Sequence, residues 1–256
     1  MNITWFGTAT ILLDDGETRL LFDPFVRQNK KINTTPLAGF TGADAILITH
    51  GHYDHLYSIP DLLQADKHPT VYCTNAPAQT LRKHNVNEDR IHVIAHGDEL
   101  HFGNFTVTPI RAKHIVFDPF YILSVVPKCA FHLPTMFRIA ALNRKFPSGH
   151  EIVMYDIHNG DKHILLCGSF GSFDDVEYPK NPDLFILANG GSVFVPEVTK
   201  KFIADIKPKT VLVDHFDDAF PPLTRKVDVT RLKHTIEKNH PNTKFIIPTE
   251  CVPVTI

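Results

Sequence analysis

Short runs of apolar and β-branched residues recur along the chain and predict a protein rich in β-strands. In the first part of the chain, these runs cover residues 3–6, 10–13, 19–22, 45–48, 70–73 and 105–108. Later runs that predict strands cover residues 151–155, 163–167, 184–188, 210–213 and 244–247. Turn signals such as Asp15-Gly16 separate the early runs, which indicates that neighbouring strands are joined by tight connections.

Longer stretches between the later strands predict helices over residues 76–84, 196–206 and 228–239, and a further helix that opens near residue 56. In residues 228–239, Val229, Leu232 and Ile236 fall on one helical face, which is typical of a helix that packs on a core. Strands therefore alternate with helices after an all-β opening. That order predicts an α+β protein with layered sheets inside and helices outside.

The segment of residues 115–150 is too apolar to be a solvated loop. Four basic residues against one acid, Asp118, give it a net charge of +3. We expect it to be an apolar insertion in a single domain of residues 1–256. It would fold as a helical cap next to His114, which directly precedes it, or as a contact between subunits of a homo-oligomer. Alternatively, this segment would pack on a ligand or on a membrane surface.

Composition and charge limit the kinds of molecule that we expect the protein to bind. The chain is 43% hydrophobic and 21% charged, which is ordinary for a globular protein. Its formal net charge of −2 creates no basic field, so nucleic acid is not an expected partner. No apolar run reaches the length of a transmembrane helix, and the first residues lack the basic start of a secretory signal. We therefore expect a cytoplasmic location.

The densest group of metal-binding residue types is His50-Gly51-His52-Tyr53-Asp54-His55, directly after the apolar run of residues 45–48. Imidazole and carboxylate groups suit zinc and related divalent ions. Because residues two apart in an extended chain point the same way, His50 and His52 can converge on one ion. A turn after them lets Asp54 and His55 face a second position. The alternative is a surface loop that carries histidines by chance.

The pattern H-x-H-x-D-H resembles the metallo-β-lactamase superfamily of metal-dependent hydrolases. The resemblance implies a four-layered αβ/βα sandwich. It also implies two ligand groups, each completed by a distal histidine: His50, His52 and His114 for a first ion, and Asp54, His55 and His215 for a second. Taken alone, each distal histidine also fits a residue that makes a single hydrogen bond.

Other short motifs refine this resemblance. Trp5-Phe6-Gly7, Phe22-Asp23-Pro24 and Asn189-Gly190-Gly191 are most similar to the branch that includes L-ascorbate-6-phosphate lactonase. Asp23 fits an ordinary turn before Pro24, and Asn189-Gly190-Gly191 fits the turn at the end of a strand. For Asp23 we favour a supporting role, because ligating histidines usually need an acceptor for their other ring nitrogen.

One position departs from the pattern of the superfamily. The family usually has Gly-Asp at this point, and the aspartate bridges two ions, whereas this chain has Gly168-Ser169. A neutral hydroxyl is a much poorer ligand for a hard dication than a carboxylate. A second ion would then rely on the substrate, on hydroxide, or on a nearby acid such as Asp174 or Asp175.

The resemblance implies a hydrolase that acts on a small molecule. A first ion held by three neutral imidazoles, with one position open, would lower the pKa of its bound water. The resulting hydroxide would cleave an ester, lactone or phosphoester bond, and Asp54 would orient the water or take its proton. One or two zinc ions are expected, with Mn²⁺ or Fe²⁺ as alternatives.

Two other functions fit the same residues. The chain fits a phosphodiesterase or lipid-processing hydrolase in which residues 115–150 form a lid over an acyl chain. It also fits a metal-binding sensor or an inactive scaffold, because Ser169 replaces the bridging acid.

Overall fold

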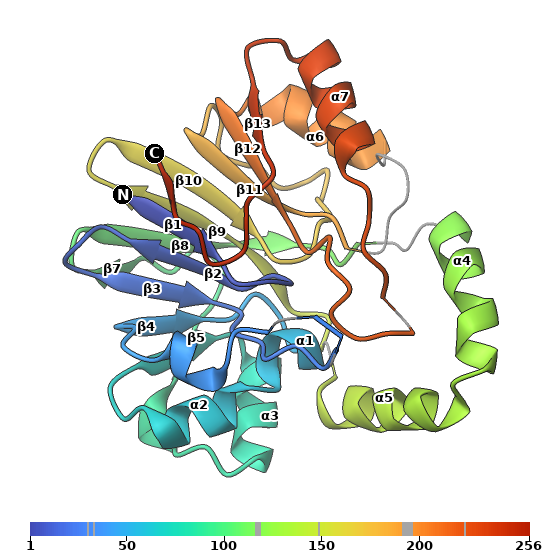
Figure 1. Ribbon diagram of the computed structural model, residues 1–256. Coiled ribbons are helices and arrows are strands. Elements are labelled where there is room, and N and C mark those ends of the chain that lie inside the picture. The colour runs from blue at the N-terminus through green and yellow to red at the C-terminus, as the bar shows by residue number, and fades with distance from the viewer. Residues whose placement is uncertain (30, 33, 116–118, 148, 191–196, 223) are drawn as a thin grey trace.

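Two mixed β-sheets face each other in the computed structural model, and helices cover the outer surface of each sheet (Figure 1). The structure describes the whole chain except residues 30, 33, 116–118, 148, 191–196 and 223. The order helix, sheet, sheet, helix confirms the layered α+β sandwich predicted from the sequence. Among the described residues, no helix has the length and apolar character needed to cross a bilayer.

The first sheet is built from the N-terminal half and one strand from the end of the chain. Its strands lie in the order β14 (Val254–Thr255), β1 (Asn2–Trp5), β2 (Ile11–Asp14), β3 (Arg19–Phe22), β4 (Ala45–Leu47), β5 (Thr70–Cys73) and β6 (Ile91–Val93). Pairing is antiparallel from β14 to β3 and parallel from β3 to β6. Its outer face is covered by α1 (Tyr53–Leu56), α2 (Ile59–Ala65) and α3 (Asn75–Lys83), and two 3₁₀ turns span Leu37–Phe40 and Glu88–Arg90.

The second sheet repeats this arrangement. Its strands lie in the order β13 (Lys244–Ile246), β12 (Thr210–Asp214), β11 (Leu184–Ala188), β10 (Lys162–Cys167), β9 (Ile152–Asn159), β8 (Phe105–Ala112) and β7 (Leu100–Phe102). Pairing is antiparallel from β7 to β10 and parallel from β10 to β13, with α6 (Glu197–Ile206) and α7 (Thr230–Asn239) on the outer face. The two halves are therefore alike in topology, although the sequence shows no repeat.

Buried side chains join the two sheets. Tyr155 of β9 is fully buried, donates a hydrogen bond from its hydroxyl to the carbonyl oxygen of Ile48 at 2.7 Å, and places its ring edge-on to Phe22 of β3 at 5.5 Å. The backbone nitrogen of Val153 also donates to the carbonyl oxygen of Thr49 at 3.0 Å. These contacts bring the ends of β4 and β9 together, directly beside His50.

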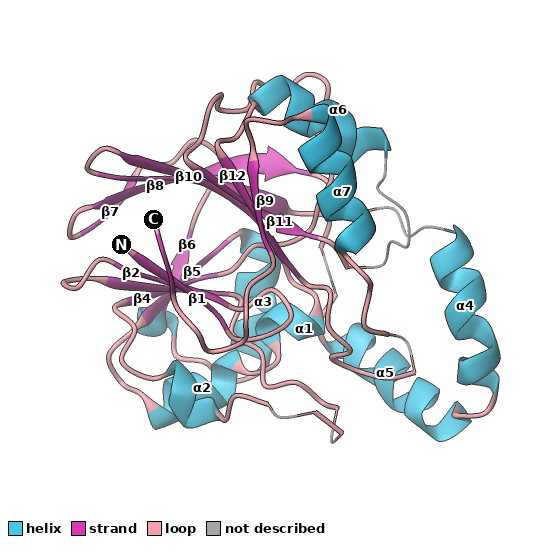
Figure 2. Ribbon diagram, turned by 45° about the horizontal axis from the view of Figure 1, so that its top comes forward, coloured by secondary structure: helices cyan, strands magenta, loops and turns pink. Residues whose placement is uncertain are grey.

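Two helices from the predicted insertion, α4 (Pro119–Ala130) and α5 (Leu133–Lys145), form an arm that stands beside the sandwich (Figure 2). The arm is attached by Tyr121 and Val125 of α4 and by Ile139 and Phe146, all of which are buried. Its outward side chains remain exposed, including Leu123 at 69%, Phe131 at 86% and Phe137 at 76%. The arm therefore has one apolar surface turned inward and another turned outward.

Several elements differ from the sequence prediction. Strands β6, β7 and β14 were not predicted, because each is only two or three residues long. Residues 53–55, expected as a loop, belong to the short helix α1 (Tyr53–Leu56). The predicted helix start at Pro196 lies outside the described residues, and the last helix begins at Thr230 instead of Asp228.

Candidate metal centre

The candidate ligands lie on loops at one end of the two sheets. His50 and His52 follow β4, and His52 directly precedes α1, which carries Asp54 and His55. His114 follows β8 of the second sheet, and His215 follows β12. The structure thus brings together all six ligands predicted from the sequence, and both sheets contribute to them.

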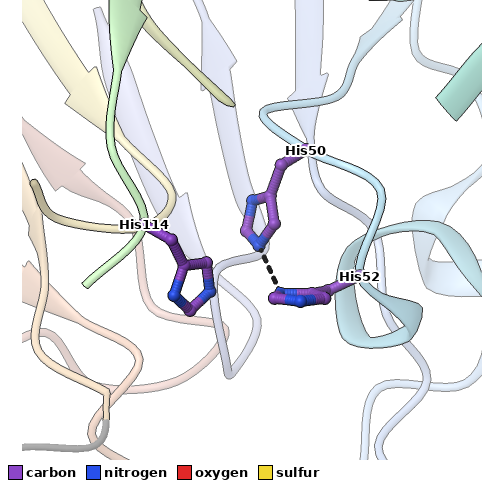
Figure 3. A group of neighbouring side chains, drawn as sticks. All are labelled: His50, His52 and His114. Carbon is purple, nitrogen blue, oxygen red and sulfur yellow. Dashed lines mark hydrogen bonds between the residues drawn. The ribbon is translucent and has the colours of Figure 1, made fainter. Parts of the chain in front are cut away.

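The first group consists of His50, His52 and His114, whose rings converge (Figure 3). Nε2 of His50 lies 3.0 Å from Nδ1 of His52. The ring centres of His52 and His114 are 4.6 Å apart. Nδ1 of His114 donates to the carbonyl oxygen of Ile115 at 2.9 Å, which leaves its Nε2 to face the other two rings. One ring nitrogen from each histidine lies within 4.8 Å of the others, which suits a shared ion.

The second group consists of Asp54, His55 and His215. Oδ2 of Asp54 lies 3.3 Å from Nε2 of His215 and 3.8 Å from Nε2 of His55. The two groups are adjacent, because the ring centres of His50 and His55 are only 3.9 Å apart. The arrangement therefore offers two neighbouring positions for ions.

Asp23 and Thr49 hold the ligands from behind. Asp23 is fully buried, and its carboxylate accepts hydrogen bonds from the backbone nitrogen of Thr49 at 2.8 Å and from the hydroxyl of Thr49 at 2.5 Å. Its Oδ2 also lies 2.8 Å from Nδ1 of His55. The hydroxyl of Thr49 also lies 3.1 Å from Nδ1 of His50. An acceptor on the inner ring nitrogen directs the outer nitrogen towards a metal. Thr49 was not identified from the sequence, because its position before His50 is the only feature that sets it apart from other threonines.

Two glycines allow this close packing. A Cβ atom on Gly168 would lie 2.2 Å from the hydroxyl of Thr49 and 2.6 Å from the carboxylate of Asp23. A Cβ atom on Gly190 would lie 2.7 Å from Nδ1 of His215. Both positions therefore require glycine because the backbone touches the residues that hold or form the ligand groups.

The protonation of the histidines differs between the two groups. Burial lowers the pKa of His50 well below its ordinary value, lowers the pKa of His52 to about 4 and lowers the pKa of His114. In the second group, burial acts to lower the pKa of His215, but the hydrogen bond and charge of Asp54 raise it to about 9. Burial also acts to raise the pKa of Asp54, but His55 and His215 outweigh it, and the pKa falls.

This donor set fits a divalent ion. Neutral imidazole is the form that binds metal, and the three histidines of the first group are kept neutral by burial. Three imidazoles leave a position open for water or substrate, and Asp54 adds the negative charge that a second ion requires.

Ser169 lies at this centre but is engaged elsewhere. Its hydroxyl accepts a hydrogen bond from the backbone nitrogen of Ile115 at 3.2 Å, next to His114. Ser169 is 5% exposed and lines the same cavity as the ligands. Asp174 and Asp175 are 96% and 72% exposed in their side chains, and Asp175 pairs with Arg111 at 2.6 Å. Neither acid lines the cavity, so the expectation that one of them could replace the bridging aspartate was wrong.

A cavity of about 460 Å³ opens from the ligand groups towards the arm. The inner side of the arm gives it an apolar wall made of Tyr121, Ile122, Val125, Val126, Cys129 and Met136. Polar groups gather at the opposite end, where His52, Asp54 and His215 line it. Arg225, in the loop between β12 and α7, adds a positive charge that the sequence analysis missed. A basic residue soon after the last ligand histidine was the available signal.

Known proteins share this fold. Residues 18–124 match the model of the Beta-lactamase superfamily domain. Igni18, a metallo hydrolase from Ignicoccus hospitalis, superposes with a TM-score of 0.71 at 16% identity, covering 99% of this chain and 97% of that one. The fold and the paired ligand groups therefore define a protein of the metallo-β-lactamase superfamily.

Sequence relatives identify the family. A UPF0173 metal-dependent hydrolase from Salinibacter ruber is 31% identical over 234 residues, which is 89% of each chain. Another from Xanthobacter autotrophicus is 36% identical over 119 residues, which is 44% of this chain and 48% of that protein. The chain belongs to the UPF0173 family of metal-dependent hydrolases.

Proposed function

We propose that the protein hydrolyses an ester, lactone or phosphoester bond in a small molecule. The observation that carries this proposal is the pair of adjacent ligand groups at the polar end of one cavity. His50, His52 and His114 would hold a first ion, and Asp54, His55 and His215 a second. A bound divalent ion would supply a water molecule acidic enough to attack at neutral pH, and would polarise the bond under attack.

The side chains of the site have separate tasks in this proposal. Asp54 stays ionised because its pKa is lowered, so it is suited to orient the attacking water more than to take its proton. Asp23 and Thr49 fix the rings of His55 and His50 from behind. The arm supplies the apolar wall against which a nonpolar part of the substrate would pack. Zinc is the ion we propose first, and Mn²⁺ or Fe²⁺ suit the same donors.

The test combines metal analysis with a substrate panel. The protein would be loaded with zinc, manganese or iron and assayed on lactones, carboxylic esters and phosphodiesters, with Asp54→Asn as the comparison. We expect turnover in one class and a loss of at least about a hundredfold in kcat for Asp54→Asn. The similarity to the lactonase branch makes lactones the first class to test. Metal binding without turnover in any class would favour a sensor or an inactive scaffold.

The apolar wall favours a second candidate, a phosphodiesterase or lipid-processing hydrolase with the arm as its acyl lid. Tyr121 and Val125 are buried at the base of α4 and line the cavity. Esters of increasing acyl length would test this candidate. A rise in kcat/KM from acetyl to octanoyl esters supports an acyl site, because each buried CH₂ contributes about 0.8 kcal/mol. A flat series would contradict it.

A further inference from the structure

Arg225 is a cation without a matching anion in the wall of the cavity. Its Nε atom is buried and, among the described residues, has no hydrogen-bond partner. Two carboxylates line the same cavity, but both are engaged. Asp54 lies 3.3 Å from His215, and Asp217 pairs with Arg27 at 2.9 Å. Among the described residues, neither carboxylate of the cavity wall thus neutralises the charge of Arg225.

We propose that Arg225 binds an anionic group of the substrate. A guanidinium group matches the two oxygens of a carboxylate or a phosphate, and such charge-assisted hydrogen bonds are strong where water is excluded. This inference rests on the proposed hydrolase function and names the substrate class as an anionic amphiphile. Its apolar part would lie against the arm, its anionic group on Arg225, and its scissile bond at the ligand groups.

Arg225 also has a purely structural role, and the experiment must distinguish this role from anion binding. Its guanidinium carbon lies 5.7 Å from the centre of the Tyr121 ring, so Arg225 helps to seat α4 through a cation–π contact. Loss of that contact would weaken the binding of every ligand that touches the arm. Loss of an anion site would weaken only the charged ligands.

Binding to metal-free protein tests the proposal without relying on turnover. Octanoate, octylphosphonate and the neutral octanamide would be titrated calorimetrically into the natural chain and into Arg225→Met, which keeps an apolar stem over Tyr121. Arg144→Met, an exposed arginine of α5 outside the cavity, is the control. We expect Arg225→Met to weaken the anions by about tenfold or more and octanamide by less than about threefold, with Arg144→Met unchanged. The anion that binds more tightly, octanoate or octylphosphonate, indicates whether the substrate carries a carboxylate or a phosphate group.

Equal losses for anions and octanamide, or no loss for either, would overturn the anion site. Both outcomes leave the hydrolase proposal standing, because no turnover is measured. Conversely, a selective loss of anion binding in a protein that hydrolyses no ester would support the anion site and contradict the hydrolase.

A separate observation concerns the outer face of the second sheet. Asp156 and His158 lie two residues apart on β9, and His163 lies directly opposite His158 on β10. Nε2 of His163 is 2.7 Å from Oδ1 of Asp156, and Nε2 of His158 is 3.6 Å from Oδ2. One ligand atom from each residue lies within 4.8 Å of the others. His163 is the second residue of β10 and Cys167 is the last, so roughly 13 Å of strand separates this cluster from the end of β10, which leads to Ser169.

We infer that Asp156, His158 and His163 form a second, peripheral zinc site, independent of the hydrolase centre. Two imidazoles and one carboxylate are a zinc donor set, and side chains on paired strands are held more rigidly than side chains on loops. His158 is about half exposed, so water can complete the coordination. The cluster would add to any zinc count made on the whole protein.

Zinc titration of the metal-free protein, with anomalous scattering from zinc-loaded crystals, tests this site. We expect His158→Ala and Asp156→Asn each to lose one ion per chain, while the ligands at His50 and His114 keep theirs. The side chain of Asp156→Asn can still accept a hydrogen bond from His163, so any loss of zinc in this variant reports the loss of the negative charge. His101→Ala is the control, since His101 is an exposed strand histidine already held by Thr106 and Glu99. Unchanged stoichiometry in both variants, or no anomalous peak beside Asp156, would contradict the site.

Discussion

Individual histidines of the centre depend on neighbours that are not candidate ligands themselves. The carboxylate of Asp23 accepts two hydrogen bonds from Thr49 and lies 2.8 Å from Nδ1 of His55. This buried pair fixes the rings of His50 and His55 before any ion arrives. The ligand geometry is therefore prepared by the fold, and single substitutions at the centre should change metal binding more than they change folding.

His52→Ala is the simplest test of the first group. His52 lies on a loop at the edge of the cavity, so the variant should fold normally. We expect metal affinity at the first group to fall by more than about tenfold, since loss of a supporting contact alone typically costs 10- to 100-fold. Elemental analysis after dialysis measures the change, and His234→Ala, an exposed histidine of α7, is the control. Full metal content in His52→Ala would rule out the group.

Ser169→Asp tests why the second position lacks a bridge. Two dications a few ångströms apart repel each other, and serine places no negative charge between them. We expect the natural chain to hold closer to one ion than two at the centre, and Ser169→Asp to approach two. Without metal, the same variant should be less stable because it buries an unpaired charge. Ser169→Ala removes the hydroxyl without adding charge and should not gain an ion.

Crystals with zinc anomalous signal would count the ions at the centre separately from any at Asp156. Two fully occupied positions in the natural chain, with no anion bound, would show that Ser169 does not limit the second ion.

The opposite pKa shifts predict different pH dependences for the two groups. His52 has a pKa of about 4, so protons compete with the first ion only in acid solution. His215 has a pKa of about 9, so below that pH a proton must leave before the second ion binds. Affinity at the second group should therefore rise about tenfold per pH unit up to about pH 9, while the first stays nearly constant above pH 6. Calorimetry in buffers of different ionisation enthalpy measures the released proton, and parallel pH profiles would contradict the assignment.

Among the helices and strands, those of the arm leave the most apolar surface exposed. Helices α4 and α5 bury only a few side chains against the sandwich and leave Leu123, Phe131 and Phe137 exposed. The described arm, residues 119–147, carries Lys128, Arg138, Arg144 and Lys145 and no acidic residue. Exposed apolar surface of this extent marks an interaction site. We propose that it is a contact between subunits.

Phe131→Ser combined with Phe137→Ser tests this contact. We expect the natural chain to sediment as an oligomer and the double variant as a monomer, because the interface would lose two large apolar side chains. Val252→Ser, which alters an exposed apolar residue outside the arm, is the control. Identical masses for the natural chain and the double variant would exclude a subunit contact through these residues.

The sequence predicted the elements whose side chains carry a clear pattern. Residues 19–22, 70–73 and 184–188 were predicted as strands and are strands with those bounds, because each contains an unbroken run of at least three apolar residues. The turn of helix at Tyr53–Leu56 was missed because it spans only four residues and is formed mainly of metal-ligand types. The six ligands were found because of their spacing and the family resemblance. Arg225 was missed because a basic residue soon after His215 is a weak local signal, and its place in the cavity wall comes from tertiary contacts.

At the scale of the molecule, the two sheets share the centre, so bound metal should hold them together. His50 belongs to the loop of one sheet and His114 to the other. Metal at about a thousand times its dissociation constant adds about 4 kcal/mol to the free energy of unfolding. For a chain of this size we expect chelation to lower the melting temperature by roughly 10 °C. Calorimetry with and without chelator measures the shift, and His52→Ala should show little of it. An equal shift in that variant would point to metal bound elsewhere.

Because the candidate ligands are far apart in the sequence, the two groups become complete at different times during synthesis. The first group is complete once residue 114 has been made, but the second waits for His215, which follows β12 near the end of the chain. At about 5–20 residues per second, several seconds separate the two on the ribosome. Every nascent chain therefore passes through a stage in which it lacks a complete second group. An ion captured during that stage would meet only the three histidines.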